Sequence, residues 1–343
     1  MAKKARQTAG ASRTKSVRLL FTCAGRRVEL INAFRAAAKA LSLKPVIHTA
    51  DADPLPAAAC VADHAHHVPP ARSSTYVAAL LRLVEREKID LLIPLIDDEL
   101  LLLARARQRF AALNCTAMIS SPYVVEICRD KLATFEFLRS QGIDTPDTWR
   151  VAEVLNRARH QFPYFLKPRR GSASKGNFIL KNKAELKALA PLVQEGIIQE
   201  FIDGVEHTLD VYTGFDGKPR CVVPRRRIEV RGGEVVTAQT VNDKAIIDTG
   251  VWVAEAFAEC VGLVTIQLIR TSEGRISVIE INPRFGGGAP LGIKAGADSP
   301  RWILSEWMGK SPRIRINHFK PDMVMLRYHD AFFRTVPTPR RHR

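Results

Sequence analysis

Residues 17–121 alternate short apolar runs with longer amphipathic stretches. Amphipathic stretches with helical spacing lie between the apolar runs 17–22 (VRLLFT), 45–50 (PVIHTA), 89–96 (IDLLIPLI) and 115–120 (CTAMIS). Strands that alternate with helices of roughly 10–15 residues are typical of a parallel sheet covered by helices. The pattern therefore predicts an α/β, Rossmann-like first domain over residues 17–121.

A helical linker is expected at 122–161, with Asp130 as the N-cap of a helix and Gly142 just after its end. Beyond the linker the strands are short and bounded by turns, and a single helix is expected over 244–261. This texture is typical of an α+β domain built on antiparallel sheets. We expect the linker and a small lid subdomain at about 122–196, and a large subdomain at about 197–310.

Two apolar strands near the end of this domain flank the dipeptide EG at 273–274, which is a two-residue hairpin signal. If this dipeptide forms the loop, Gln267 lies opposite Glu280, and Asn282 shares their face of the sheet. Three oxygen donors of this kind suit Mg²⁺, which usually binds together with substrate phosphates. The alternative is the polar, solvent-facing side of an ordinary hairpin.

A phosphate site is indicated around Lys167, which ends an apolar strand and needs an anion if its ammonium group is desolvated. The loop that follows contains Gly171, Ser172 and Gly176. It is not a Walker A motif, because Asn177 occupies the position of the required lysine. We therefore expect a flexible loop between strands to cover the phosphates.

Residues 197–211 (IIQEFIDGVEHTLDV) place Glu200, Phe201 and Ile202 where an adenine ring could lie on an apolar ledge, and Glu206 where it could accept from ribose hydroxyls. A strand–turn–strand with exposed acids has the same pattern.

In the run 224–230 (PRRRIEV), Arg225 and Arg227 share one face of a strand and could bind a substrate carboxylate with two hydrogen bonds. A solvated basic edge strand is the alternative.

The net charge of +17 is concentrated at the ends of the 343-residue chain. Residues 1–18 and 311–343 each contribute +6, so we expect a basic tail at 1–16 and a basic extension at 311–343 that are solvated. A nucleic-acid arm and, for the first segment, an organellar presequence are alternatives. The histidines at 64, 66 and 67 are expected in a solvated loop rather than at a metal.

The six cysteines are scattered and form no CxxC pair, which favours buried thiols in a reducing compartment. No apolar run is long enough to cross a bilayer, and no secretory signal opens the chain. The expectation is a cytoplasmic protein without a membrane partner.

In their order along 17–310, the segments CRDKLATFEFLRSQGIDTP, YFLKPRRGSASKG, IIQEFIDGVEHTLDV and TIQLI…VIEINPRFGGG resemble the ATP-grasp superfamily, particularly its carbamoyl-phosphate-synthase-like and carboxylate–amine ligase members. The resemblance implies a pre-ATP-grasp domain followed by a two-part ATP-grasp domain. It implies a role for each of the following residues: Lys131 and Lys167 bind phosphates, Gly171 to Gly176 form the flap, Glu200 and Ile202 contact adenine, Glu206 binds ribose, Gln267, Glu280 and Asn282 bind magnesium, and Arg284 stabilises an acyl phosphate.

The activity that this resemblance implies is an ADP-forming ligation of a small-molecule carboxylate to an amine, with ATP and Mg²⁺ as cofactors and Mn²⁺ as a substitute. Three consecutive glycines, Gly286, Gly287 and Gly288, would let the backbone approach the substrate. Phosphorylation of bicarbonate or another small carboxylate is one alternative, and a non-catalytic protein that binds ATP or a polyanion is another. A homodimer is left open.

Overall fold

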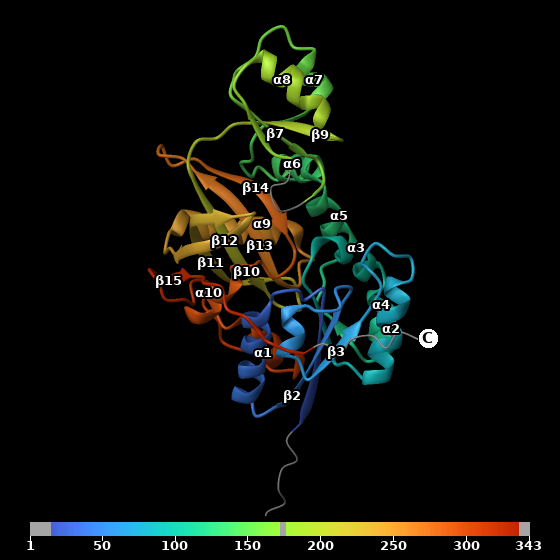
Figure 1. The fold of residues 1–343 in the computed structure, drawn as a ribbon. Coiled ribbons are helices and arrows are strands. Elements are labelled where there is room, and N and C mark those ends of the chain that lie inside the picture. Colours follow the sequence, from blue (N-terminus) through green and yellow to red (C-terminus); the bar gives the residue numbers. More distant parts are fainter. Residues whose placement is uncertain (1–14, 172–175, 336–343) are drawn as a thin grey trace, which may run out of the picture.

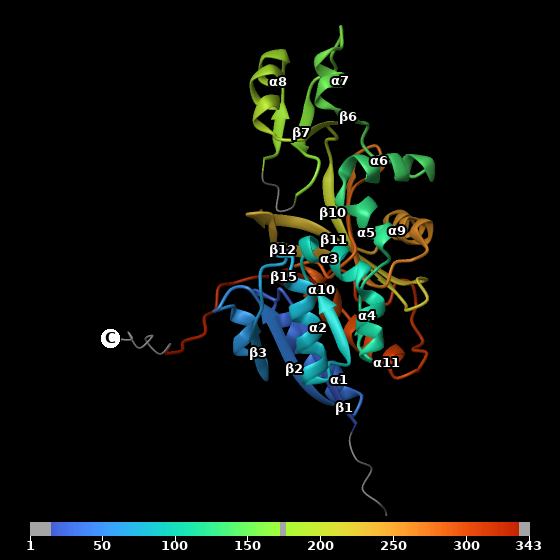
Figure 2. The ribbon, with the colours of Figure 1, turned by 90° about the vertical axis from the view of Figure 1, so that its right-hand side faces the viewer.

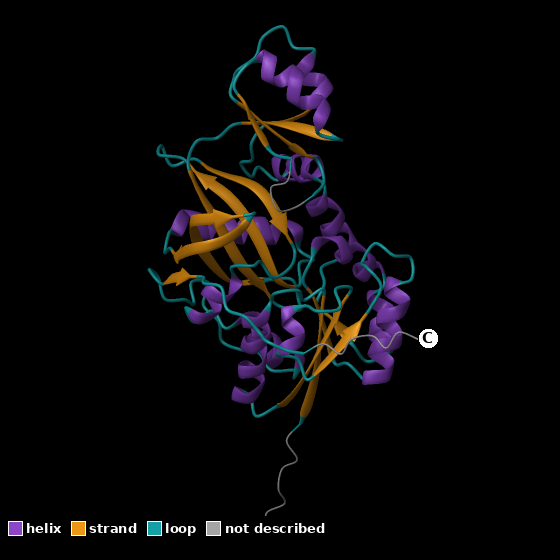
Figure 3. Ribbon diagram, in the orientation of Figure 1, coloured by secondary structure: helices purple, strands orange, loops and turns teal. Residues whose placement is uncertain are grey.

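The computed structural model describes residues 15–171 and 176–335. Figure 1 shows three parts stacked along the long axis of the molecule: the first domain at the bottom, a six-stranded sheet in the middle, and a four-stranded sheet with two helices at the top. Figure 3 separates the strands from the helices that cover them. The predicted fold class, a parallel sheet followed by antiparallel sheets, is confirmed.

The first domain is a parallel sheet with the strand order β3-β2-β1-β4-β5. Its elements are β1 (Ser16–Thr22), α1 (Val28–Ala40), β2 (Lys44–Asp51), β3 (His64–His67), α2 (Tyr76–Glu87), β4 (Leu91–Pro94), α3 (Asp97–Arg105), α4 (Arg107–Ala112) and β5 (Thr116–Ala117). Leu19 and Phe21 pack on the side of α1, whereas Leu20 packs on the side of α2. Because both faces are covered, β1 is a continuous apolar run.

The small subdomain is an antiparallel sheet with the order β6-β9-β7-β8. Its elements are β6 (Thr148–Arg150), α7 (Val151–Leu155), β7 (Tyr164–Pro168), β8 (Phe178–Leu180), α8 (Lys183–Leu189) and β9 (Gly196–Glu200). This subdomain extends a few residues past the expected boundary at about 196, because β9 pairs with β6 and β7 and buries Ile198 in its core.

The large subdomain is a six-stranded sheet with the order β14-β13-β10-β11-β12-β15. Its elements are β10 (Val205–Thr213), β11 (Pro219–Arg231), β12 (Glu234–Thr240), α9 (Lys244–Phe257), β13 (Gly262–Arg270), β14 (Ile276–Asn282), α10 (Ala289–Lys294), α11 (Ser299–Trp307) and β15 (Val324–Leu326). Helix α9 covers one face, and α10 and α11 cover one end of the other.

The helical linker belongs to the core of the large subdomain rather than to the lid. Val124 of α5 (Pro122–Arg129) and Leu138 of α6 (Lys131–Ser140) pack in the same cluster as α9 and β14. As predicted, Asp130 caps α6 by accepting from two backbone N–H groups, and Gly142 follows the helix with a φ of +71°.

We expected a solvated extension after α11, but the described part of this segment packs against the rest of the protein. β15 pairs with β12, the backbone N–H of Val222 donates to Ile316 O, and Phe319 packs against two of the cores. The prediction considered the basic charge of the segment and overlooked the apolar residues spaced along it. The expected basic tail at 1–16 lies almost wholly outside the described residues.

The expected histidine loop is also wrong, because residues 64–67 form β3 and pair with β2. His48 Nδ1 and His66 Nε2 lie 3.0 Å apart, and the rings of His48 and His64 are stacked. Among the described residues, no group of three or more histidine, cysteine or acidic side chains could hold a metal.

All six cysteines are free, and four of them are buried, whereas Cys60 is exposed. Across residues 15–171 and 176–335, no helix combines the length and the apolar character that crossing a bilayer requires.

Truncation should separate the packed part of the C-terminal extension from the rest. Deleting 332–343 should leave the free energy of unfolding within about 0.5 kcal/mol, because residues 332–335 are exposed. Deleting 311–343 should lower it by about 3 kcal/mol or more, since Phe319, Met323 and Met325 lose their contacts. Equal urea midpoints for the two truncations would contradict the packing described here.

Candidate functional site

One face of the six-stranded sheet gathers polar side chains from four strands. Directly opposed residues share a face, so the strand registers place these residues together. The set comprises Glu206, Thr208 and Asp210 on β10, Arg225 and Arg227 on β11, Thr265 and Gln267 on β13, and Glu280 and Asn282 on β14. Figure 2 shows the small subdomain standing above this sheet.

The β13–β14 hairpin reaches the predicted pairing by a different route. Near the turn Arg270 pairs with Ile276, one residue away from the register of a two-residue loop, and the backbone N–H of Thr271 donates to Arg275 O. A β-bulge then shifts the register, so that Gln267 lies opposite Glu280 as predicted. The bulge corrects for the longer turn.

The three predicted magnesium ligands lie side by side and offer oxygens. The side-chain nitrogen of Asn282 donates to Glu280 Oε1 at 3.1 Å, and that of Gln267 donates to Glu206 Oε1 at 3.1 Å. With their nitrogens engaged by carboxylates, both amides present oxygen to a cation. A site with one to two carboxylates and amide oxygens fits Mg²⁺, whose remaining ligands are usually waters and phosphates.

Lys167 lies at the end of β7 in the small subdomain and is 5% exposed. Burial lowers its pKa to about 8, the charge of Lys131 acts in the same direction, and the carboxylates of Glu280 and Glu206 oppose the shift. Lys167 therefore lies within electrostatic reach of the metal ligands, although it comes from the other subdomain. A buried ammonium group is unfavourable without a partner, so binding an anion would stabilise its charged form.

Asp130 joins the start of α6, which begins with Lys131, to the segment just after β7, which contains Lys167. The carboxylate of Asp130 pairs with Arg169 at 2.6 Å while it caps α6, and the backbone N–H of Lys131 donates to Arg169 O. Lys131 Nζ also donates to Gly171 O at 2.9 Å. The start of α6 is thus joined to the start of the predicted flap.

The ends of that flap have backbone angles that favour glycine. Gly171 has a φ of +130° and Gly176 a φ of +76°. Ser172, predicted to bind ATP, lies outside the described residues.

The predicted adenine ledge forms the connection between the two subdomains. Glu200 ends β9, its carboxylate pairs with Arg275 at 2.5 Å, and Ile202 is buried. Among the described residues, 201–203 make no backbone hydrogen bond to other backbone groups, which leaves the donors and acceptors of this connection for a base. Phe201 is half-buried beside them.

Glu206, the predicted ribose acid, also holds Arg227. Their side chains pair at 2.5 Å, and the side chain of Glu206 is 36% exposed. Arg227, predicted to bind a substrate carboxylate, is therefore paired with a carboxylate of the protein itself.

Arg225 shares its face with Arg227 as predicted, but its place is not that of a substrate ligand. It is 1% exposed, and its Nε and Nη2 donate to the two oxygens of Asp210 at 2.7 and 2.8 Å. A Cβ on Gly288 would lie 2.1 Å from Arg225 Nη1. The missing side chain at Gly288 thus makes room for this arginine, and the expected carboxylate site on Arg225 is corrected to an internal ion pair.

Arg284 reaches the junction with the first domain. Its Nε and Nη2 donate to the carboxylate of Asp97, at the start of α3, at 2.8 and 2.5 Å. Gly287 follows closely, and its carbonyl oxygen accepts from Arg327. The predicted acyl-phosphate arginine therefore stands where the large subdomain meets the carboxyl ends of β1 and β4.

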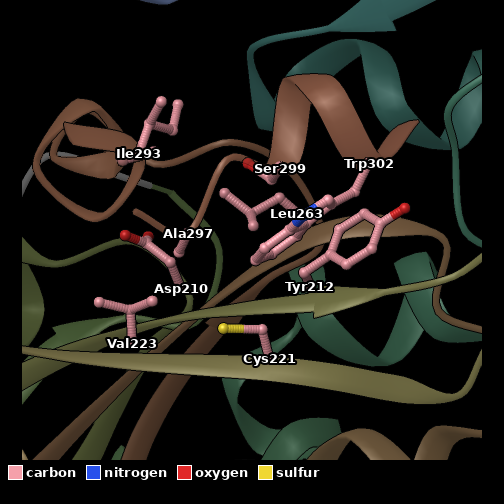
Figure 4. A pocket seen from close by; sticks show the side chains of 10 residues that line it. Asp210, Tyr212, Cys221, Val223, Leu263, Ile293, Ala297, Ser299 and Trp302 are labelled. Atoms are coloured by element: carbon pink, nitrogen blue, oxygen red, sulfur yellow. The ribbon is translucent and has the colours of Figure 1, made fainter. Parts of the chain in front are cut away.

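The opposite end of the same sheet face is apolar and closed. Between the sheet and the helices α10 and α11 lies a cavity of about 10 Å³, lined by Tyr212, Cys221, Leu263 and Trp302 among others (Figure 4). This volume holds about one water molecule. This end of the face therefore has no room for a molecule larger than water.

Comparison with known proteins agrees with this geometry. Residues 128–288 match the family model of the ATP-grasp domain, and residues 19–118 match that of the PylC-like N-terminal domain. The fold and the site thus define a protein of the ATP-grasp class. The chain contains an ATP-grasp domain at residues 128–288, preceded by a PylC-like N-terminal domain at 19–118.

Among curated relatives, D-alanine–D-alanine ligases of Fusobacterium nucleatum and Thermotoga petrophila are each 35% identical, over 88 and 109 residues. These matches cover 26% and 29% of this chain and 29% and 36% of the relatives, so the chain matches about a third of their length.

Among solved structures, L-amino acid ligase from Bacillus licheniformis is similar with a TM-score of 0.67 and 18% identity, over 86% of this chain and 75% of that one. N5-carboxyaminoimidazole synthetase from Staphylococcus aureus, complexed with ADP, has a TM-score of 0.69 and 16% identity, over 89% and 80%. These two likenesses show the fold.

Several residues of the site were not predicted from the sequence. Asp97 could have been found, because it follows a predicted parallel strand, and ligands of α/β folds gather at such ends. Arg275 and Asp210 carry no such signal, since their roles depend on pairing with residues that are distant in the chain.

Glu280→Gln should weaken magnesium-dependent ATP binding by at least about 100-fold while the fold survives, because a neutral amide cannot replace the carboxylate ligand. Calorimetric titration of MgATP measures the loss. Glu273→Gln, an exposed change in the turn of the same hairpin, is the matched control. A wild-type titration curve for a folded Glu280→Gln protein would exclude Glu280 as a metal ligand.

ATP binding should take up a proton at about pH 9 and none at about pH 6.5. Lys167 has a pKa of about 8 without nucleotide, so it is largely neutral at the higher pH and charged at the lower one. The phosphates raise its pKa again, because a nearby anion favours the ammonium form. Calorimetry in two buffers of different ionisation enthalpy measures this uptake, which should vanish in Lys167→Met and persist in Lys187→Met; uptake in both variants would exclude Lys167.

Proposed function

We propose that the protein is an ADP-forming ligase that joins a small-molecule carboxylate to an amine through an acyl phosphate. The observation that carries the proposal is the convergence of Gln267, Glu280 and Asn282 on one sheet face, with the buried Lys167 opposite. The ATP-grasp match and the fold shared with L-amino acid ligase support it.

ATP is proposed to lie between the two subdomains. Its base would contact the backbone at 201–203, its ribose Glu206, and its phosphates Lys131 and Lys167 under the flap. Mg²⁺ on Glu280, Asn282 and Gln267 would neutralise phosphate charge, and Mn²⁺ would suit the same oxygen donors. A fold neighbour complexed with ADP supports a nucleotide in this place.

In the first step, an oxygen of the substrate carboxylate attacks the γ-phosphorus, and the bond from that phosphorus to ADP breaks. In the second, the amine attacks the acyl carbon and phosphate leaves with the attacking oxygen. The chain contributes positioning and positive charge, and no side chain acts as a nucleophile. Arg284 lies at the domain junction, where it would face the developing oxyanion.

Phosphorylation of bicarbonate without an amine acceptor is the second candidate. Bicarbonate as the carboxylate is supported by the fold shared with the biotin carboxylase domain of Hydrogenobacter thermophilus 2-oxoglutarate carboxylase, which was solved with MgADP and bicarbonate. An ADP-release screen of carboxylic acids and amino acids, singly and in pairs, with bicarbonate included and product masses determined, distinguishes the two activities.

Oxygen labelling tests the acyl phosphate directly. With ¹⁸O in the substrate carboxylate, the label should appear in the released phosphate, because the attacking oxygen leaves with phosphorus. Label recovered in AMP would indicate adenylation instead.

Arg284→Lys should still bind ATP but turn over about 10² to 10³ times more slowly, since a single ammonium group does not reproduce the planar fork of arginine. Arg301→Lys, on the exposed side of α11, is the control. Steady-state ADP release and MgATP calorimetry measure the two effects, and an unchanged rate for a folded Arg284→Lys protein would remove Arg284 from the mechanism.

A further inference from the structure

Arg27 is a guanidinium group without a carboxylate partner at the domain junction. It lies in the turn between β1 and α1, and a Cβ on Gly287 would come within 2.7 Å of its Nη1. Among the described residues, no acid lies within ion-pair distance of it. Burial lowers the pKa of Arg27 to about 10, the charges of Arg284 and Arg327 add to the shift, and the carboxylates of Glu234 and Asp97 oppose it.

Arg327 arrives at the same place from the C-terminal extension. β15 continues the large sheet at β12, and the backbone N–H of Arg327 donates to Val236 O at 3.0 Å. Its side chain donates to Gly287 O and lies 3.9 Å from Glu234. Figures 1 and 2 both show the extension crossing from β15 towards the first domain. Neither family model covers this segment.

The positive charge at this junction is not balanced. Arg284 pairs with Asp97 at 2.5 Å, and Arg26 pairs with Glu234 at 2.9 Å. Arg27 then has no carboxylate partner among the described residues, and Arg327 lies 3.9 Å from Glu234. Like charges held together in a partly desolvated place repel one another unless an anion binds between them. Gly287 lies between the two guanidinium groups and has no side chain to separate them from a ligand.

We propose that Arg27 and Arg327 bind an anionic group, a carboxylate or a phosphate, carried by the amine substrate. The inference rests on the proposed ligase function. Arg284, next to these residues in the junction, marks the expected place of the acyl phosphate, so an anion held by Arg27 and Arg327 would bring the attached amine beside the acyl carbon. The acceptor is therefore an amino acid or a phosphorylated amine rather than a plain amine. Guanidinium groups bind both anions in two-point geometry.

Matched acceptors test the inference with the carboxylate that the ADP-release screen identifies. Alanine is compared with ethylamine, and phosphoethanolamine with ethanolamine, in the full-length protein. The acceptor with a carboxylate or the one with a phosphate should have a kcat/KM at least about 10-fold above that of its uncharged partner, and the better pair identifies the anion.

Arg27→Met and Arg327→Met should each raise KM for the anionic acceptor about 10-fold or more and leave KM for ATP unchanged. Arg327→Lys should retain part of the affinity, because it keeps the charge. Arg313→Met, an exposed arginine of the same extension, should behave as wild type. If uncharged amines are used equally well, or if neither variant changes KM for the acceptor while ADP is still released, the inference is wrong and the ligase proposal stands.

Chemical modification gives a readout that does not depend on turnover. Phenylglyoxal modifies guanidinium groups that it can reach, so inorganic phosphate should slow the modification of Arg27 and Arg327 and leave that of the exposed Arg313 unchanged. Mass spectrometry of peptides measures these rates. If no pair of substrates releases ADP, the proposed function fails, and protection of Arg27 by phosphate still decides the anion site: equal rates with and without phosphate overturn it.

Discussion

The site depends on one extra residue in β14. The register shift opposite Gln267 and Leu268 leaves Ile279 without a partner, so that Val278 and Ile281 both enter the core beneath α9. In a regular strand, residues three apart would point to opposite faces. The bulge therefore satisfies two demands at once: apolar residues face the core, and Glu280 and Asn282 face the nucleotide side.

The same sheet face is divided by the buried ion pair of Asp210 and Arg225. On one side of the pair lie the side chains that are proposed to bind the nucleotide, and on the other lies the apolar cavity beneath α11. Removing one partner from such a pair typically costs about 3–5 kcal/mol, because the other charge remains buried. Because a Cβ on Gly288 would lie 2.1 Å from Arg225 Nη1, the pair requires glycine at this position. The triple glycine therefore meets a packing requirement, in addition to the substrate role proposed for it.

Local pattern was enough to predict the sheets and the pairing of the metal-site hairpin, but not the helices α8, α10 and α11, because only one helix was expected after the linker. Alternation gave the parallel sheet of the first domain, and the hairpin gave the pairing of Gln267 with Glu280, although the turn was longer than assumed. Arg225 and the C-terminal extension were misjudged for a common reason. A run of basic residues shows charge but not its partners, and Asp210 and β12 lie far from them in the chain.

In the first domain, charged side chains occupy the place where related α/β folds bind a ligand. The strand order reverses between β1 and β4, and open α/β sheets bind ligands at such a point. A dinucleotide bound there would need glycines in the turn after β1. That turn has Gly25 alone, followed by Arg26 and Arg27, while the loop after β4 leads to Asp97. A glycine-rich turn would bind a phosphate through its own backbone N–H groups. The arginine and aspartate side chains of this domain instead contact groups of the large subdomain. Asp97 and Arg27 of the first domain therefore face Arg284 and Gly287 of the large subdomain, as the proposed substrate site requires.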